Sequence, residues 1–271
     1  MTPPLAARRW RPSPLIQTTL GIHLGALGVL FAWPQQWAGA LAAVVASHLA
    51  LTAAGLWPRS GLLGPNITRL PAAAAARGEI ALTIDDGPDP AVTPQVLDML
   101  DAAGARASFF CIGARAAAHP ELVAEIVRRG HTVENHSHHH RHHFSLFGPR
   151  RIAADVAEAQ STLGRLAGST PRYFRPPAGL RNPFLEPVLA RNGLHLAAWT
   201  RRGFDTREGD PARVLARLTR DLAAGDILLL HDGHAALTPA GRPVILDVLP
   251  TLLERIAAAG LRPVTLRQAL Q

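Results

Sequence analysis

The chain has 271 residues, 48% of them hydrophobic, which is enough for one large core or for a core domain with an appendage. The formal net charge is +8, and every basic residue is an arginine. No stretch interleaves basic and aromatic residues and no nucleic-acid-binding motif occurs, so we predict no nucleic-acid partner and favour an anionic membrane surface. The single cysteine, Cys111, excludes an intrachain disulfide, and its apolar neighbours indicate a core residue.

Two uncharged apolar stretches, residues 15–33 and 37–57, occupy most of the N-terminal region. Each has about the 20 residues that a helix needs to cross a bilayer, and tryptophans stand at their ends, as they do at membrane interfaces. We therefore predict that residues 1–57 form an anchor of two transmembrane helices whose partner is membrane lipid. A cleaved signal peptide and the buried helical hairpin of a soluble protein are the alternatives. The first run is long for a signal peptide, and the second would still anchor the chain.

Arginines flank both apolar stretches, whereas the turn between the stretches is neutral. They are Arg8, Arg9 and Arg11 before the first stretch and Arg59, Arg69 and Arg77 after the second. Because positive charge near membrane spans stays on the cytoplasmic side, both flanks and the rest of the chain are expected in the cytoplasm. His23 and His48 weaken the two predicted spans. Residues 58–78 are predicted to form an irregular linker.

Short apolar runs alternate with longer amphipathic stretches over residues 79–271. The predicted strands are 80–84, 107–112, 132–135, 173–175, 194–199, 227–230 and 263–266. The predicted helices, several of which open on proline and close near glycine, are 93–103, 114–129, 149–166, 183–192, 211–223 and 243–259. This alternation predicts an α/β domain whose parallel sheet is closed, or nearly closed, into a barrel.

Polar residues follow several of the predicted strands, at the edge where such barrels carry their sites. They are Asp85, Asp86, His136, Arg175, Asp205 and His231. Two adjacent carboxylates at the end of a buried strand repel each other and lose solvation, so they need a cation or a strong hydrogen-bond partner. An acidic turn is the alternative for Asp85 and Asp86, because Asp-Gly and Asp-Pro pairs are common in turns.

Six of the thirteen histidines lie between His136 and His143. On a turn of helix after the third strand, two of their imidazoles can bind one metal ion together with an aspartate of the 85–86 pair. Two histidines and a carboxylate leave positions open for water and substrate, as in catalytic zinc sites. The residues that can accompany His136 are His138, His139, His140 and His143. A solvated, histidine-rich loop is the alternative.

His231 and Arg175 each follow an apolar strand. His231 stands at the strand's exit, where a general acid is needed, although a histidine there is often a hydrogen-bonded core residue. Arg175 is followed by two prolines. It can fix a catalytic carboxylate and keep it ionised, or it can pair with a structural acid.

Four stretches of the chain together resemble the ordered motifs of the polysaccharide deacetylase family, also called the NodB-homology family or carbohydrate esterase family 4. They are Thr83-Ile84-Asp85-Asp86-Gly87-Pro88, His136-Ser137 with His140, Arg175-Pro176-Pro177-Ala178-Gly179 and Leu228-Leu229-Leu230-His231. They occur in the family's order within residues 79–267. The resemblance implies a distorted (β/α)7 barrel, preceded here by the predicted hairpin, with residues 79–271 as the catalytic domain.

The resemblance also implies a role for each matching residue. The matches are Asp85 with the general base, Asp86, His136 and His140 with the metal ligands, Arg175 with the residue that orients the base, His231 with the general acid, and Ala178 with the backbone N–H that stabilises the oxyanion. The implied cofactor is a divalent metal, most often Zn²⁺, with Co²⁺, Ni²⁺ and Mn²⁺ as alternatives. The implied activity is hydrolysis of N-acetyl groups from an amino-sugar-containing glycan or glycolipid, with no protein partner.

The chain departs from the family pattern in two places. Ala178 stands where many members carry an aromatic residue, so one wall of the substrate groove is either missing or supplied elsewhere. The fourth motif is reduced to Asp205, which we expect to partner His231 or Arg175, a loop aspartate being the alternative. Alternative activities are an O-acetyl esterase and a deformylase acting on a lipid-linked sugar. A catalytically inactive sugar-binding membrane protein is the non-enzymatic alternative.

Overall fold

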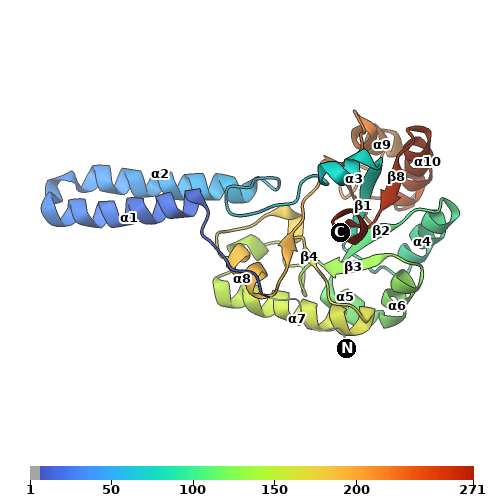
Figure 1. Cartoon of the computed structure of the whole chain (residues 1–271), viewed down its shortest axis with the longest axis horizontal. Helices are drawn as coiled ribbons and strands as arrows, with labels where there is room; N and C mark the ends of the chain where they lie inside the picture. Colours follow the sequence, from blue (N-terminus) through green and yellow to red (C-terminus); the bar gives the residue numbers. More distant parts are fainter. Residues whose placement is uncertain (1–6) are drawn as a thin grey trace.

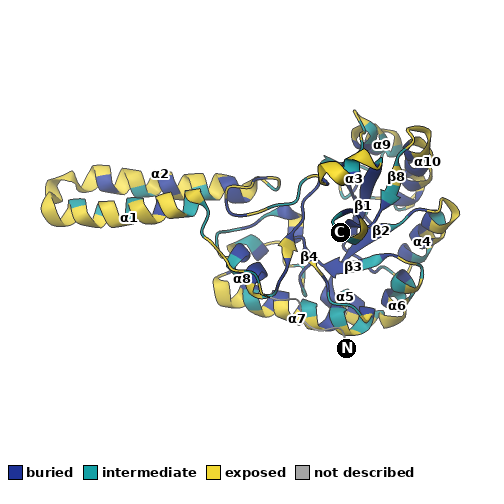
Figure 2. Ribbon diagram, in the orientation of Figure 1, coloured by how far each residue is buried: buried dark blue, intermediate teal, exposed yellow. Residues whose placement is uncertain are grey.

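A computed structural model describes residues 7–271, so the first six residues of the predicted anchor lie outside the described part. Two long helices, α1 (Pro14–Ala32) and α2 (Trp37–Leu56), run side by side and project from the rest of the chain (Figure 1). The short 3-10 helix η1 (Pro34–Gln36) joins them. Both long helices are apolar enough to cross a membrane by length and composition. Most of their surface is exposed (Figure 2).

The open end of this hairpin contacts the rest of the chain. Arg8, ahead of α1, donates its backbone N–H to the carbonyl oxygen of Ala190 and forms an ion pair of 3.0 Å with the buried Glu186. At the end of α2, the carbonyl oxygen of Gly55 accepts the N–H of Arg181 at 3.1 Å. A Cβ added at Gly55 would lie 2.2 Å from the carbonyl oxygen of Arg181, so this close approach of two backbones requires glycine.

One parallel sheet organises the remainder of the chain, in the order β5-β4-β3-β2-β1-β7-β6, and β8 pairs with the first residues of β1. The strands are β1 (Glu79–Asp85), β2 (Ala107–Cys111), β3 (Thr132–Asn135), β4 (Tyr173–Phe174), β5 (His195–Leu196), β6 (Arg201–Arg202), β7 (Ile227–His231) and β8 (Arg262–Val264). The sheet curls, because the segment 195–202 pairs with β4 at its start and with β7 at its end. This arrangement confirms the predicted distorted parallel barrel.

Of the predicted fifth strand, 194–199, only His195–Leu196 form a strand, β5, and the next strand, β6, begins at Arg201. Between them, the carbonyl oxygens of Ala197 and Ala198 accept hydrogen bonds from the Arg175 side chain at 2.9 and 2.7 Å. These two carbonyl groups are therefore directed at Arg175 rather than at a neighbouring strand, which interrupts the pairing. The linker is also more ordered than predicted, because Ile67 forms a bridge with Ala197 and residues Ala72–Ala76 form helix α3.

Helices cover the outside of the curled sheet (Figure 1). They are α4 (Thr93–Ala102), α5 (Gly113–Ala118), α6 (Pro120–Arg128), α7 (Pro149–Ala167), α8 (Leu185–Arg191), α9 (Pro211–Thr219) and α10 (Ile245–Ala258), with the 3-10 turn η2 (Phe144–Leu146). The short helix α11 (Leu266–Ala269) packs with Ala81 in the inner core, and the 3-10 turn η3 (Pro177–Gly179) lies at the pocket. The predicted helix 114–129 is broken between α5 and α6 at Pro120, which lacks an N–H and restricts the conformation of His119. The last predicted strand ends two residues early because Thr265 and Gln268 form a capping box that starts α11.

Alternation along β1 determines which side chains face the site. Ile80, Leu82 and Ile84 belong to the large apolar core shared with the helices. Ala81 belongs to a second core on the inner face of the sheet. Because successive side chains of a strand point to opposite faces, Asp85 points to the same inner side as Ala81. The core pattern of β1 thus places a carboxylate at the mouth of the barrel.

Candidate active site

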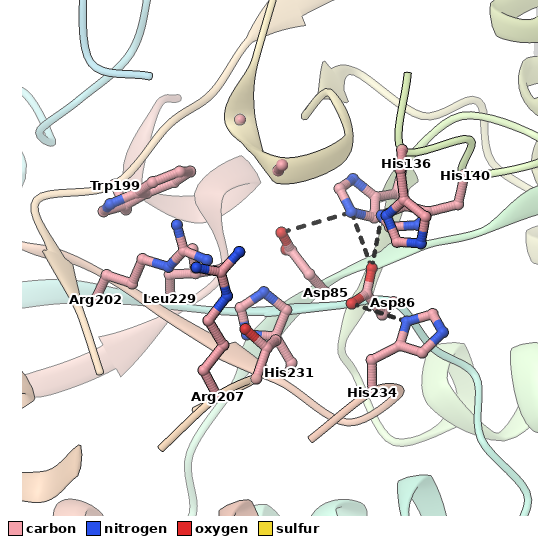
Figure 3. A pocket seen from close by; sticks show the side chains of 14 residues that line it. Asp85, Asp86, His136, His140, Trp199, Arg202, Arg207, Leu229, His231 and His234 are labelled. Atoms are coloured by element: carbon pink, nitrogen blue, oxygen red, sulfur yellow. Dashed lines mark hydrogen bonds and ion pairs between the residues drawn. The ribbon is translucent and has the colours of Figure 1, made fainter. Parts of the chain in front are cut away.

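The predicted site residues converge on one pocket of about 310 Å³ at the carboxyl ends of the strands. Asp85, Asp86, His136, His140, Ala178 and His231 line it. Arg175 and Asp205 are buried behind this lining and contact it through hydrogen bonds. Figure 3 shows the labelled aspartates and histidines directed into the same space from different segments of the chain.

Asp86 lies between two imidazoles. Its Oδ1 is 3.1 Å from Nε2 of His136 and 3.0 Å from Nε2 of His140 (Figure 3). Burial alone raises the pKa of Asp86, but hydrogen bonds with histidines, led by His136 and His140, hold the pKa well below its usual range. The Nδ1 atom of His136 lies 2.7 Å from the carbonyl oxygen of Arg175, which fixes the ring and leaves Nε2 free.

These three residues fit a divalent metal. Their ligand atoms lie within 4.8 Å of one another, and the buried Oδ1 of Asp86 lies between the two imidazole nitrogens. Two imidazole nitrogens and one carboxylate oxygen are a donor set typical of catalytic zinc sites. A divalent cation held by these three residues would compensate the buried Asp86 charge while both histidines stay neutral.

The histidine run does not form the predicted turn of helix. Asn135 Oδ1 accepts the N–H of Ser137 at 2.9 Å, and Ser137 Oγ accepts the N–H of His140 at 3.1 Å. Ser137 and His140 both have left-handed backbones, with φ of 65° and 49°. This irregular turn brings His140 to Asp86, and it directs the rings of His138 and His139 to Glu158 and Asp155 instead.

Arg175 holds Asp85 in place. Its Nη1 donates to Asp85 Oδ1 at 2.6 Å and to Thr83 Oγ1 at 2.9 Å. The guanidinium lies 4.2 Å from the centre of the Phe110 ring. Since Arg175 also donates to the carbonyl oxygens of Ala197 and Ala198, its buried guanidinium forms four hydrogen bonds that fix its geometry.

His231 is paired with Asp205 rather than standing alone. Its Nδ1 lies 2.8 Å from Asp205 Oδ1, and its backbone N–H donates to Asp205 Oδ2 at 2.8 Å. Burial by itself lowers the pKa of His231, but the negative charge and hydrogen bond of Asp205 outweigh burial and raise the pKa to about 9. Of the two partners predicted for Asp205, the structure therefore places His231, and not Arg175, in contact with it.

Ala178 lies in the 3-10 turn η3 with a left-handed backbone, φ 56°. The next residue, Gly179, approaches Trp199 so closely that an added Cβ would lie 2.6 Å from its ring. Trp199 lines the pocket beside Ala178. The aromatic surface that the chain lacks at position 178 is thus supplied from the segment between β5 and β6.

Sequence reasoning missed several pocket residues. His234 Nδ1 lies 3.2 Å from Asp86 Oδ2, and Arg115 contacts both the Asp86 carbonyl oxygen and the His234 ring. His234 stands three residues after His231, on the loop that leaves β7, which is the one signal that pointed to it. Arg202 and Arg207 also line the pocket, and nothing in the sequence distinguished them from the other arginines.

Comparison with known proteins places these residues in context. The polysaccharide deacetylase family pattern matches residues 73–197. A peptidoglycan-N-acetylglucosamine deacetylase of Bacillus cereus is 30% identical over 194 residues, which cover 71% of this chain and 88% of the relative. A chitooligosaccharide deacetylase of Sinorhizobium fredii is 36% identical over 179 residues, covering 65% of this chain and 76% of the relative.

A solved structure agrees with these sequence matches. The family 4 carbohydrate esterase from Streptomyces lividans, solved in complex with acetate, superposes with a TM-score of 0.62 at 31% identity. The superposition covers 69% of this chain and 91% of that enzyme.

Proposed function

Because the chain belongs to the polysaccharide deacetylase family and is thereby a hydrolase of carbon–nitrogen bonds other than peptide bonds, we propose that it removes N-acetyl groups from an amino sugar of a glycan or glycolipid. One observation supports this proposal: Asp85 held by Arg175, the cluster of Asp86, His136 and His140, and the pair of His231 and Asp205 meet at one pocket. The peptidoglycan and chitooligosaccharide deacetylases among the relatives support an acetylated glycan as the substrate class.

Asp86, His136 and His140 would hold the divalent metal, for which Zn²⁺ suits the donor set best and Co²⁺, Ni²⁺ and Mn²⁺ are alternatives. When bound, such a metal supplies Lewis acidity that polarises an acyl carbonyl and lowers the pKa of water. His234 adds a third imidazole against Asp86 and helps to orient that carboxylate.

Asp85 is the proposed base. Its Oδ1 is held by Arg175, and its Oδ2 lies 3.8 Å from His136 Nε2, at the edge of the pocket. Asp85 removes a proton from the water molecule that attacks the acetyl carbonyl carbon. The backbone N–H of Ala178 is the proposed donor to the carbonyl oxygen as negative charge develops on it.

His231 is the proposed acid. Asp205 keeps its imidazole protonated at neutral pH and fixes Nδ1, which leaves Nε2 to donate a proton to the departing sugar nitrogen. The tetrahedral intermediate then collapses to acetate and a free amine. Arg175 and Asp205 do not touch the reacting atoms in this scheme; they act by positioning Asp85 and His231.

The pH dependence of turnover tests the role of His231. Because the pKa of His231 is raised, its imidazole stays protonated through neutral pH and loses the proton only as pH rises through that raised pKa. Turnover is therefore expected to decline in the alkaline range. Asp205→Asn is expected to move this alkaline limb to lower pH by about 1–3 units, because an opposite charge raises a neighbouring pKa by that amount. A bound metal lowers the pKa of His231 in both proteins, so the difference between their kcat–pH profiles is the measurement. An unchanged alkaline limb would exclude His231 as the acid.

The proposed activity is tested on the full chain in detergent, loaded with Zn²⁺. Acetate release is measured from N-acetyl chitooligosaccharides and from O-acetylated xylan, and formate release from an N-formyl amino sugar. We expect acetate with a matching amount of free amine. Acetate without amine would indicate an esterase, formate would indicate a deformylase, and sugar binding without any product would indicate the inactive binding protein.

We further propose that α1 and α2 anchor the protein in the membrane, with the barrel on the cytoplasmic side. Their length, apolar exposed surface and flanking arginines support this proposal. Full-length protein is expected to stay in membranes after an alkaline carbonate wash. When fused after Trp57, a reporter that works only in the cytoplasm is expected to be active, and one that works only in the periplasm is expected to be inactive. A periplasmic signal would reverse the orientation, and a mature chain shortened near residue 40 would indicate a cleaved signal peptide.

A further inference from the structure

Two arginines line the pocket without an acidic partner among the residues that the structure describes. Arg202, half-buried in β6, and Arg207, exposed on the following loop, line the wall opposite His136 and His140 (Figure 3). Neither side chain forms an ion pair or a hydrogen bond with the described residues 7–271. The Nε atom of Arg202 is buried and lacks an acceptor. The contacts of the Arg202 guanidinium are with the rings of Trp199 and Phe204, at 5.4 and 4.9 Å.

Neighbouring arginines are neutralised by the fold, which makes this pair distinctive. Arg201, adjacent in sequence, is paired with Asp226. Arg217, on α9, pairs with Glu208 at 3.2 Å. Acidic partners are therefore available in this part of the chain, and they are directed away from Arg202 and Arg207.

The carboxylates of the pocket are already committed. Asp85 is bonded to Arg175 and Asp205 to His231. Asp86 faces the imidazoles of the proposed metal site. Two guanidinium groups near each other and partly removed from water repel each other unless an anion lies between them. Since neither arginine is in direct contact with a described carboxylate, an anion bound directly to both would come from outside the described residues.

We propose that Arg202 and Arg207 form a subsite for a phosphoryl group attached to the N-acylated sugar. Each guanidinium presents a planar fork of donors that matches phosphate oxygens, and one fork alone satisfies a carboxylate. Two forks therefore fit a phosphoryl group better than a carboxylate. This inference rests on the proposed function, since it names the substrate class of the same site.

The position of the hairpin is consistent with a phosphoryl group that joins a sugar to a lipid. A Cβ added at Gly179 would lie 2.9 Å from Pro58, the residue after Trp57 at the end of α2, and 2.6 Å from the Trp199 ring. Arg59 donates to the carbonyl oxygen of Thr200 at 3.2 Å. The end of the apolar hairpin thus lies against the wall that carries Trp199 and continues into Arg202. Both a lipid-linked and a free sugar phosphate share the chemistry that this subsite would bind.

The test measures binding rather than turnover. Full-length Asp85→Asn protein, loaded with Zn²⁺ in detergent, is titrated calorimetrically with N-acetylglucosamine, N-acetylglucosamine 1-phosphate, its prenyl-linked phosphodiester and N-acetylmuramic acid. We expect the 1-phosphate to bind at least about tenfold more tightly than the neutral sugar, as charge-assisted hydrogen bonds imply. In a variant that also carries Arg202→Gln and Arg207→Gln, the ratio of the two affinities is expected to fall towards one.

Arg220→Gln is the matched control, because Arg220 is 84% exposed and lies at the end of α9 outside the pocket. It removes one exposed positive charge without changing the pocket and should keep the preference. The subsite would be overturned if the Arg202/Arg207 variant kept the preference for the 1-phosphate over the neutral sugar. It would also be overturned if the variant lost the same affinity for neutral and phosphorylated sugars. Tighter binding of N-acetylmuramic acid than of the 1-phosphate would also overturn the phosphoryl assignment. Tighter binding of the prenyl-linked compound than of the free 1-phosphate would identify a lipid as the source.

This binding result is independent of catalysis. If wild-type protein releases no acetate from any sugar but binds the phosphate through the two arginines, the proposed function fails and the subsite stands. If it releases acetate equally from neutral and phosphorylated sugars and the arginine variant binds both alike, the proposed function stands and the subsite fails.

Discussion

Replacing Asp85 by Asn is expected to abolish turnover while leaving the metal bound. Asn keeps a carbonyl oxygen that can accept the hydrogen bond from Arg175, now 2.6 Å long, so the geometry of the pocket is retained. Its amide nitrogen cannot accept a proton from water. The loss of a positioned base lowers kcat by about 10²–10⁴-fold or more. Asp86, His136 and His140 are unchanged, so metal content measured by mass spectrometry should stay at one per chain.

The control for Asp85→Asn is Asp221→Asn. Asp221 is 86% exposed and has a left-handed backbone, φ 50°, which Asn adopts readily. This variant should keep both activity and stability. Asp85→Asn itself is expected to lose about 1–3 kcal/mol of unfolding free energy, because the Arg175 charge is then paired with a neutral acceptor. Turnover within tenfold of wild type, in a protein that holds its metal, would rule out Asp85 as the base.

Much of the fold was predictable because its signals are local. Apolar runs of four to seven residues, separated by amphipathic stretches that begin on proline, already indicate alternating strands and helices. The family predicted from four short motifs is confirmed by the relatives and by the Streptomyces structure. The predictions that failed depend on contacts between parts of the chain that are distant in sequence. The predicted strand 194–199 is shortened to two residues because the carbonyl groups of Ala197 and Ala198 bind Arg175, which lies some twenty residues earlier in the chain.

The site was predictable in part for the same reason. Its residues follow strands, and parallel strands end at a common edge, so Asp85, His136 and His231 were expected to meet. Spacing alone could not select the second histidine, because the choice depends on left-handed backbones at Ser137 and His140 rather than on helical geometry. A sequence also does not show which charged side chains lack a partner of opposite charge. Among the described residues, Arg201 has an acidic partner, whereas Arg202 and Arg207 have none and line the pocket.

The domain boundaries at residues 57 and 78 remain a prediction. The contacts of Arg8 with Glu186, and of Gly55 with Arg181, connect the hairpin directly to the barrel. Glu186 is buried, and its Oε2 has no hydrogen-bond partner among the described residues, so the ion pair with Arg8 is its main compensation. A fragment that begins after the hairpin would lose this pair. Full-length protein is therefore the appropriate sample for every measurement on the site.

Replacing His136 by Ala is expected to remove the metal. The substitution deletes one of three ligand atoms and leaves Asp86 and His140, which are too few to hold a divalent ion against competing water. Because changes to residues that only support ligands already weaken metal binding about 10–100-fold, loss of a ligand should weaken it at least 100-fold. The variant should contain no metal after dialysis against a weak chelator. Its kcat should fall to background, and wild-type protein stripped of metal should behave in the same way.

His139→Ala is the matched control, since it removes a histidine from the same run. His139 lies 3.1 Å from Asp155 and is half-exposed, away from Asp86. This variant should retain one metal per chain and most of its activity. The comparison decides between the two interpretations of the histidine run: a built site predicts loss at position 136 only, whereas a histidine-rich loop that scavenges metal predicts a small loss at both positions. One full metal equivalent in His136→Ala would contradict the assignment of Asp86, His136 and His140 as ligands.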